Sequence, residues 1–266
     1  MKDDNDDTKF QNNACDIVIP EYNKMKKSAI SLGNSCVINA IIIIHPSIPH
    51  DLKPAAKFKY VTQNKLTMTP DGTLEGVVKK TKSGYSAIKF RKEYSSADKE
   101  EAFLGDIQNE QEGLSIESHS FENIDDNYKS IKEEYQVTID DKTEVAGDLI
   151  YLNPMLYNAR TDNPFKMEER QYPVDYAIPI ESTYMFQFTI PEGYSVESMP
   201  EGSSIGLPEK ATLFSYSAKQ MGDKITVISR VKITKTLFSA NEYEALKEFY
   251  NLIIKKHTEQ IVLKKS

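Results

Sequence analysis

Residues able to carry nucleophilic chemistry are few in this chain. The two cysteines are Cys15 and Cys36, and no Cys-x-x-Cys pair is present. A cysteine nucleophile needs a histidine close in space and a third group that orients the histidine. His45, His50 and His119 are the candidates for that partner, but no recognisable nucleophile motif surrounds either cysteine. We therefore expect no catalytic residue and no structural zinc site, and the two cysteines are either free thiols or one disulfide.

Carboxylates offer a second kind of chemistry. A glycosidase-type hydrolase built on two of Glu181, Glu192 and Glu197 would need the two carboxyl groups ~5–10 Å apart. Sequence separation does not reveal such a distance, so this hydrolase is the weakest of the alternatives. Asp140-Asp141-Lys142 has neither the ligand spacing nor the glycine of a calcium loop, and it predicts a turn. We expect no bound metal and no cofactor.

Aromatic side chains on the surface would support binding instead of catalysis. Tyr151, Tyr157, Tyr172 and Tyr176 are candidates for a platform that contacts a glycan or a peptide. A tyrosine combines a large apolar ring with a hydroxyl group that forms hydrogen bonds, and this suits such contacts. Tyrosine is equally ordinary in the core of a β-sandwich. A glycan- or peptide-binding module is therefore one of the functions that the sequence leaves open.

The composition is that of a folded, acidic protein. The 266 residues carry 33 Lys and Arg against 40 Asp and Glu, a formal net charge of −7. This balance gives no electrostatic reason to expect nucleic acid as a partner. The most apolar stretch, 37–44, is far shorter than the ~20 residues that cross a bilayer, so we expect no membrane insertion. The acidic start Met1–Asp7 lacks the basic region of an export signal.

The elements that would position these groups fall into three segments. Residues 1–51 lack a periodic pattern and predict a poorly ordered extension. Residues 52–163 predict an antiparallel β domain with short helices, and a Pro70-Asp71-Gly72 turn marks its first hairpin. Further strands are expected at 114–121, 131–139 and 145–152. In the second of these, the alternation assigns one face to the apolar residues Ile131, Tyr135, Val137 and Ile139.

A helical insertion is predicted inside this first β domain, over 95–113. Ser95, Ser96 and Asp98 are candidate N-caps, because their side chains can accept hydrogen bonds from free backbone N–H groups. A narrow apolar stripe follows these residues, and Gly113 is the expected stop.

Residues 164–266 predict a second, sandwich-like β domain closed by one helix. Strands are expected at 184–190, 214–218 and 225–234 because apolar and polar residues alternate there. The sequence Ser239-Ala240-Asn241-Glu242 is a capping box, and it predicts the start of an amphipathic helix over 239–257. Lys255, Lys256 and His257 are expected to complement the negative end of this helix. The predicted fold class is therefore mainly β, with two antiparallel sheet or sandwich domains.

Three strings of residues carry a resemblance to a known family. They are Arg170–Tyr176 (RQYPVDY), Ile190–Tyr194 (IPEGY) and Asn241–Leu246 (NEYEAL). These strings resemble the domain of unknown function that follows the transglutaminase-like core in large multidomain bacterial proteins. The preceding stretch, about 60–154, is similar to the β-rich segment that links the core to this domain. The resemblance covers about 52–265, and it leaves the catalytic core without a counterpart in this chain.

The resemblance implies an accessory module that has no catalytic activity of its own. It implies a transglutaminase-like catalytic domain or another envelope protein as the partner, and the periplasm or cell envelope as the location. The main hypothesis is therefore a non-catalytic interaction module associated with a transglutaminase-like protein. The alternative is a glycan- or peptide-binding module of the cell envelope.

Overall fold

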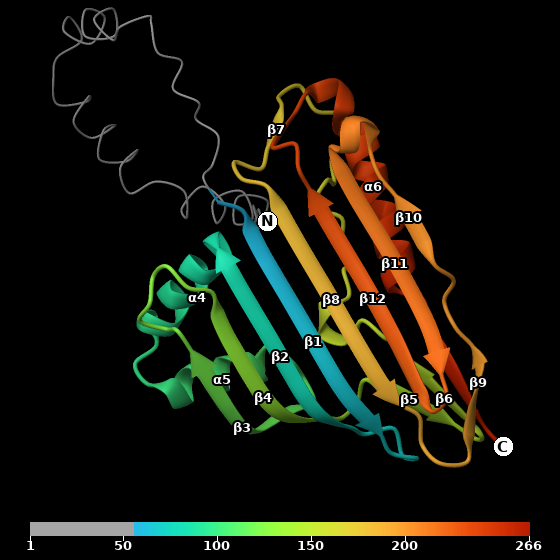
Figure 1. The fold of residues 1–266 in the computed structure, drawn as a ribbon. Helices are drawn as coiled ribbons and strands as arrows, with labels where there is room; N and C mark the ends of the chain where they lie inside the picture. The colour runs from blue at the N-terminus through green and yellow to red at the C-terminus, as the bar shows by residue number, and fades with distance from the viewer. Residues whose placement is uncertain (1–55) are drawn as a thin grey trace, which may run out of the picture. The chain divides into compact units, whose positions relative to one another are not determined.

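A mixed sheet of eight strands dominates the computed structural model, which describes residues 56–266 (Figure 1). The strands lie in the order β10-β11-β12-β8-β1-β2-β4-β3. Their bounds are β1 (Phe58–Met68), β2 (Leu74–Gly84), β3 (Leu114–Glu122), β4 (Ile131–Ile139), β8 (Ile180–Thr189), β10 (Ser203–Ile205), β11 (Thr212–Met221) and β12 (Lys224–Ile233). The predicted turn at Pro70-Asp71-Gly72 joins β1 to β2, and Gly72 has the positive φ of 95° that this turn requires.

Two smaller antiparallel sheets accompany the large one. A four-stranded sheet has the order β5-β6-β14-β9, and a two-stranded sheet pairs β13 with β7. Their bounds are β5 (Thr143–Ala146), β6 (Leu149–Leu152), β7 (Val174–Asp175), β9 (Tyr194–Ser198), β13 (Leu237–Phe238) and β14 (Ile261–Lys265). The single strand expected at 145–152 is in fact the end of β5 and the whole of β6, because Gly147, with a φ of 62°, turns the chain back on itself.

Three α-helices complete the described part of the chain, together with the 3₁₀ turns η1 (Leu156–Asn158), η2 (Pro208–Lys210) and η3 (Ala240–Glu242). The expected insertion at 95–113 consists of α5 (Glu100–Asn109), preceded by a helix that was not predicted, α4 (Tyr85–Ser96). Ser95 and Ser96 do not cap α5: they end α4, where each hydroxyl donates to the carbonyl of Lys92. The apolar face of α4 is narrow, because its buried apolar residues are Ala87 and Phe90. The helical periodicity of apolar residues in this part of the sequence is therefore weak.

The closing helix agrees closely with its prediction. It starts as η3 and continues as α6 (Tyr243–His257), and the Glu242 carboxylate accepts a hydrogen bond of 2.9 Å from the backbone N–H of Ser239. The expectation for its last residue was wrong. His257 is 2% exposed, and burial lowers its pKa to about 4, so the imidazole is neutral near pH 7 and adds no charge to the helix end.

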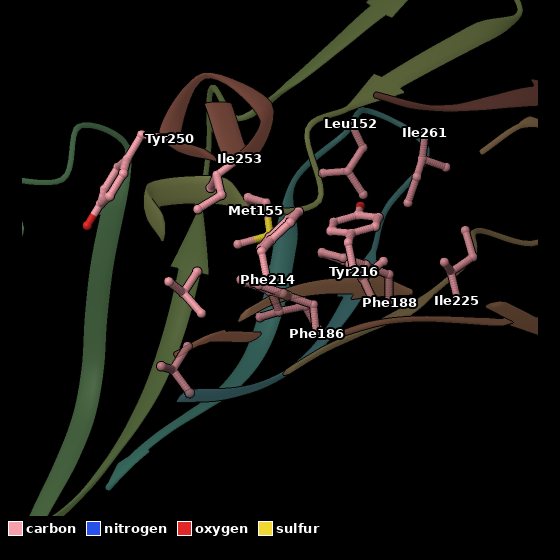
Figure 2. Packing of buried hydrophobic residues seen from close by; sticks show 14 of the residues in the cluster. Leu152, Met155, Phe186, Phe188, Phe214, Tyr216, Ile225, Tyr250, Ile253 and Ile261 are labelled. Carbon is pink, nitrogen blue, oxygen red and sulfur yellow. The ribbon is translucent and has the colours of Figure 1, made fainter. Parts of the chain in front are cut away.

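The core lies between one face of the large sheet and a layer made of α6 and the four-stranded sheet. Figure 2 shows Phe186, Phe188 and Phe214 of the large sheet close to Ile253 of α6 and Leu152 of β6. The same cluster of buried residues also includes Leu66 and Tyr135 from the first half of the chain. The described strands that precede residue 163 in the sequence and those that follow it therefore share one hydrophobic core.

The mainly β class is confirmed, and the sheet shows how its two halves are joined. Strands β1 and β8 pair in parallel, from Phe58 opposite Ile180 to Thr67 opposite Thr189. All other strand pairs of the described chain are antiparallel, as expected. Segments 52–163 and 164–266, expected as separate domains, thus share one sheet, and residues 56–266 form one compact unit.

Several expectations concern residues outside the described part of the chain. They are the poorly ordered extension 1–51, the apolar stretch 37–44, Cys15, Cys36, His45 and His50. Within 56–266, no helix combines the length and the apolar character needed to cross a membrane.

Candidate functional site

Three neighbouring strands of the large sheet carry a gradient of polarity along their buried face. The register places Thr62 of β1 opposite Lys80 of β2, and Lys80 opposite Glu133 of β4. Residues two apart along a strand share a face, so each strand adds further polar or apolar groups to this side. The polar positions are Tyr60, Thr62, Asn64, Lys80, Lys82 and Glu133, and the apolar ones further along are Leu66, Met68, Leu74, Val78, Val137 and Ile139. The polar positions of all three strands therefore lie toward the same end of the face, although the residue of β4 opposite Lys82 is the buried apolar Ile131.

A cavity of about 310 Å³ lies over the middle of this gradient. Its floor includes Thr62, Lys80 and Tyr135 at the polar end, and Val78 and Val137 at the apolar end. The opposite wall comes from the end of α5, the start of β3 and the 3₁₀ turn η1. The residues of that wall are Ile107, Glu110, Gln111, Leu114, Ile116, Leu156, Tyr157 and Asn158. Ligand sites in proteins commonly start at about 300 Å³. This cavity reaches that size, and polar and apolar groups contribute equally to its lining.

One hydrogen bond ties the two parts of that wall together. The hydroxyl of Tyr157 in η1 donates to the carbonyl oxygen of Glu112, which follows α5, over 2.7 Å. The ammonium of Lys142 lies 4.7 Å from the centre of the Tyr157 ring. The wall is therefore held in place by residues that are 45 positions apart, which gives the cavity a defined shape.

Two polar groups at the floor have no partner among residues 56–266. Thr62 is 1% exposed, and its hydroxyl makes no hydrogen bond of good geometry there, although it lies close enough to the Tyr60 hydroxyl to oppose the burial that raises the pKa of that phenol. Lys80 forms no ion pair in this part of the chain either, and its ammonium lies 5.1 Å from the centre of the Tyr135 ring. Burial lowers the pKa of Lys80, opposed by the nearby Glu133. Buried polar groups are nearly always hydrogen-bonded, so the buried Thr62 hydroxyl, next to a half-buried ammonium that has no ion pair among residues 56–266, marks a candidate binding site.

The neighbouring carboxylate of Glu133 is ion-paired, although its Oε1 atom makes no hydrogen bond of good geometry among residues 56–266. Glu133 is 2% exposed, and one of its carboxylate oxygens lies 2.9 Å from the ammonium of Lys82. The other oxygen accepts a hydrogen bond of 2.8 Å from the hydroxyl of Tyr135, whose pKa burial raises. With both lysines protonated, two ammonium groups face one carboxylate, and Lys80 at the cavity is the one without an ion pair among residues 56–266.

Two of the carboxylates considered for hydrolysis, Glu181 and Glu192, lie far apart. Glu181 lies near the start of β8, and Glu192 follows the end of this strand. At ~3.3 Å per residue, β8 extends about 26 Å from Glu181 to Thr189, and the chain reaches Glu192 only after that. Glu197 lies on β9 in another sheet and is exposed. The Asp140-Asp141 pair forms the expected turn, with Asp141 at a φ of 61°. Over residues 56–266, no group of three His, Cys, Asp or Glu side chains is arranged to hold a metal ion.

The candidate tyrosines divide between different environments. Tyr157 lines the cavity, as described above. Tyr176 is half-buried, and its hydroxyl donates to that of Tyr250 over 3.1 Å. Tyr172 is 75% exposed, and Tyr151 lies half-buried on β6. These four residues therefore form no common platform.

The remaining histidine candidate, His119, takes part in a surface cluster. Its Nε2 lies 2.8 Å from one carboxylate oxygen of Glu100, and the hydroxyl of Tyr94 donates to the other. The hydrogen bonds from Tyr94 and His119 lower the pKa of Glu100. All three side chains are at least partly exposed, and their polar atoms already bind one another.

Sequence reasoning missed the residues that matter most at the cavity. Glu133 stands two residues from both Ile131 and Tyr135, so the period of two already placed it on the buried face. Lys80 and Lys82 alternate in the same way with Val78. Charged residues on the apolar face of an alternating strand were the signal that could have indicated this site.

A second hollow, of about 400 Å³, lies at the surface beside the start of β14. The ammonium of Lys256, which lines this hollow, lies 2.8 Å from the carboxylate of Glu259 and also donates to the carbonyl of Glu201. The ammonium of Lys256 therefore has protein partners, unlike that of Lys80.

The comparisons with known proteins concern mainly the second half of the chain. Residues 148–263 match the model of a family described as a Domain of Unknown Function with a solved structure (DUF3858). The match starts at the turn before β6 and ends within β14. Strands β1, β2 and β4 therefore lie outside the match. These three strands form the floor of the cavity together with part of β8, which lies inside the match. No curated protein matches the sequence.

One solved structure shows a limited similarity. It is described as the crystal structure of a "putative protease" from Parabacteroides distasonis ATCC 8503, and it is 14% identical with a TM-score of 0.33. The similarity covers 37% of this chain and 19% of that one, so this chain spans only a small part of that protein. A similarity at this level carries no argument about activity.

Proposed function

We propose that this chain is a non-catalytic accessory module that binds a ligand in the cavity over β1, β2 and β4. The observation that carries the proposal is a pair of polar groups at the cavity floor: the ammonium of Lys80, which has no ion pair among residues 56–266, and the hydroxyl of Thr62, which has no well-formed hydrogen bond there. Leaving a buried hydroxyl without a partner costs about 1–3 kcal/mol, and a bound ligand or water that supplies the partner removes this cost.

The accessory part of the proposal rests on the resemblance of the sequence. The strings Arg170–Tyr176 and Asn241–Leu246 both fall inside the stretch 148–263 that matches the domain of unknown function. We propose a transglutaminase-like protein as the partner of this module for that reason. Purification of the chain together with such a protein from the same cells would support this part, and its absence from repeated purifications would contradict it.

The binding part can be tested without knowing the natural ligand. Ligand-observed NMR would screen the full chain against a panel of sugars, short peptides, and neutral, cationic and anionic small molecules. A cavity-filling variant, Ile116→Trp, should abolish the signals of true cavity ligands. The matched control is Ser115→Trp, because Ser115 is exposed, neighbours Ile116 on β3 and does not line the cavity. The proposal would be contradicted if no compound of the panel binds the wild type, or if every compound that binds the wild type also binds Ile116→Trp.

The absence of catalysis needs its own measurement. We expect no turnover of a broad panel of ester, amide and glycoside substrates, since Glu181 lies far from Glu192 and Glu197 is exposed on another sheet. Turnover that follows the protein through purification, and that the variants Glu181→Gln or Glu197→Gln abolish, would contradict this expectation.

A further inference from the structure

The cavity over β1, β2 and β4 is polar at one end and apolar at the other, and this division indicates what it binds. Val78, Val137 and Phe186 line the cavity on three different strands, and Ile139 extends the apolar end. The polar end presents the ammonium of Lys80 and the hydroxyl of Thr62, which are directly opposite each other in the sheet. A ligand that fills both ends must be an amphiphile.

The charge at the polar end selects the sign of the ligand's head group. Among residues 56–266, Glu133 is engaged by Lys82 and Tyr135, whereas Lys80 has no ion-pair partner. A carboxylate placed beside Lys80 would accept one charge-assisted hydrogen bond from the ammonium and a second from the Thr62 hydroxyl. A cationic head group at this end would meet the charge of Lys80.

One carboxylate of the protein also lines the cavity and must be considered. Glu110 is the residue that follows α5, and its side chain is exposed. Water and salt weaken the field of an exposed charge, whereas a half-buried ammonium acts at short range in a less polar surrounding. The polar end is therefore dominated by Lys80.

The volume limits the size of the ligand. A cavity of about 310 Å³ holds on the order of ten water molecules, at ~30 Å³ each. The part of a ligand that lies inside it therefore has on the order of ten non-hydrogen atoms. Medium-chain fatty acids and the C-terminal residue of an apolar peptide both meet this limit and share the required chemistry.

We infer that the cavity binds a small amphiphilic carboxylate, with its carboxylate on Lys80 and Thr62 and its apolar body against Val78 and Val137. This inference rests on the proposed function, since it names the class of ligand for the same cavity. It commits to a single negative charge because one free ammonium and one free hydroxyl match one carboxylate, whereas a phosphate would bring more charge and more acceptors.

Two pairs of probes test the inference by isothermal titration calorimetry on the full chain. Octanoate is compared with octanol, and N-acetyl-leucine with N-acetyl-leucinamide, so each acid has a neutral partner of similar shape. Each acid that binds should do so about tenfold or more tightly than its partner, because a charged hydrogen bond replaces a neutral one. Tighter binding of octanoate would point to acyl chains, and tighter binding of N-acetyl-leucine to peptide ends. Both results support the inference.

The variants locate the effect. Lys80→Met should weaken octanoate binding about tenfold or more and change octanol binding little. Thr62→Val keeps the shape of the side chain without its hydroxyl and should weaken octanoate binding several-fold. The matched control is Lys79→Met, because Lys79 neighbours Lys80 on the opposite face of β2, where it pairs with Glu134 at 2.8 Å. Far-UV circular dichroism and the Tm establish that each variant is folded.

The outcomes separate the two proposals. If octanol or octylamine binds the wild type as tightly as octanoate does, and Ile116→Trp abolishes that binding, the cavity is a ligand site and the inferred charge is wrong. If octanoate binds but Lys80→Met and Lys79→Met behave alike, the inferred position of the carboxylate is wrong. If no probe and no compound of the wider panel binds, the proposed function fails and the inference fails with it.

Discussion

The imidazole of His257, at the end of α6, lies 2.9 Å through its Nε2 atom from the hydroxyl oxygen of Ser229 on β12. Its other nitrogen, Nδ1, accepts a hydrogen bond of 3.1 Å from the backbone N–H of Arg160. Because Nδ1 accepts, the proton of the neutral ring is on Nε2, which donates to Ser229. One neutral histidine thus connects the closing helix, the large sheet and the segment after η1.

This arrangement predicts a loss of stability in mild acid. Burial, and next the charge of Arg160, lower the pKa of His257 to about 4 from an ordinary value near 6.5. Between these values the unfolded chain binds the proton and the folded chain does not, so the free energy of unfolding falls as the pH falls. At ~1.4 kcal/mol per pKa unit, the loss between pH 6.5 and 4 is roughly 2–4 kcal/mol.

Urea denaturation at several pH values would measure this loss. The variant His257→Gln removes the titrating group, and its stability should fall less steeply than that of the wild type over the same range. The difference between the two slopes cancels the contribution of the carboxylates. Parallel slopes would show that His257 is already protonated in the folded protein.

The sequence predicted which face of a strand each side chain occupies more reliably than it predicted which strands pair with each other. Strand 131–139 was placed to the residue, because alternation assigns each side chain to a face. The parallel pairing of β1 with β8 was missed, because the period of a strand does not state which other strand lies beside it. The cavity was missed for the same reason: Thr62, Lys80 and Glu133 meet only through the register of three strands.

His257 illustrates a second limit. A histidine in the last turn of a helix has the same sequence context whether it points to water or into the core. The capping box at Ser239 was readable because all of its partners are within four residues. The burial of His257 depends on Ser229 and Arg160, which are 28 and 97 positions away.

The closing helix should depend on its buried face more than on its cap. Phe249 is 3% exposed in the core, and Phe249→Ala should lower the free energy of unfolding by ~3–5 kcal/mol. Ser239→Ala should lower it by about 0.5–2 kcal/mol, since it weakens only the capping box. Leu252→Ala is the matched control on the same helix, because Leu252 is 39% exposed. Chemical denaturation would compare the three. A Phe249→Ala protein as stable as the Leu252→Ala protein would refute the packing account.

Two glycines should differ in how well they tolerate a side chain. Gly113 and Gly222 both have positive φ, 80° and 62°, where alanine costs about 1–2 kcal/mol. A Cβ atom on Gly113 would also lie 2.2 Å from the carbonyl oxygen of Asp140, whereas one on Gly222 would meet no atom within 4 Å. Gly113→Ala should therefore destabilise the protein at least about twice as much as Gly222→Ala in thermal unfolding. Equal shifts in Tm would mean that the backbone at Asp140 moves away freely.

The buried pair of Glu133 and Lys82 should be strongly coupled. The side chains of Glu133 and Lys82 are 1% and 19% exposed, so removing one partner leaves a charge without compensation in a poorly hydrated place. Lys82→Met should therefore cost about 3–5 kcal/mol, which is a large part of the ~5–15 kcal/mol that stabilises a typical domain. Part of this cost comes from the ring of Phe90, whose centre lies 4.2 Å from the Lys82 ammonium.

A double-mutant cycle separates these contributions. Glu133→Gln removes the charge, and its side-chain oxygen can still accept the hydrogen bond from Tyr135. Once Glu133 is neutral, Lys82→Met no longer strands a carboxylate, so in that background it should cost about 1 kcal/mol, mainly the lost contact with Phe90. The difference between the two backgrounds is the coupling energy, which we expect to be about 2–4 kcal/mol. It would be measured from urea midpoints at pH 7 and low salt. A coupling energy close to zero would mean that water reaches Glu133 once Lys82 is removed, and the excess positive charge assigned to Lys80 would then lose its basis.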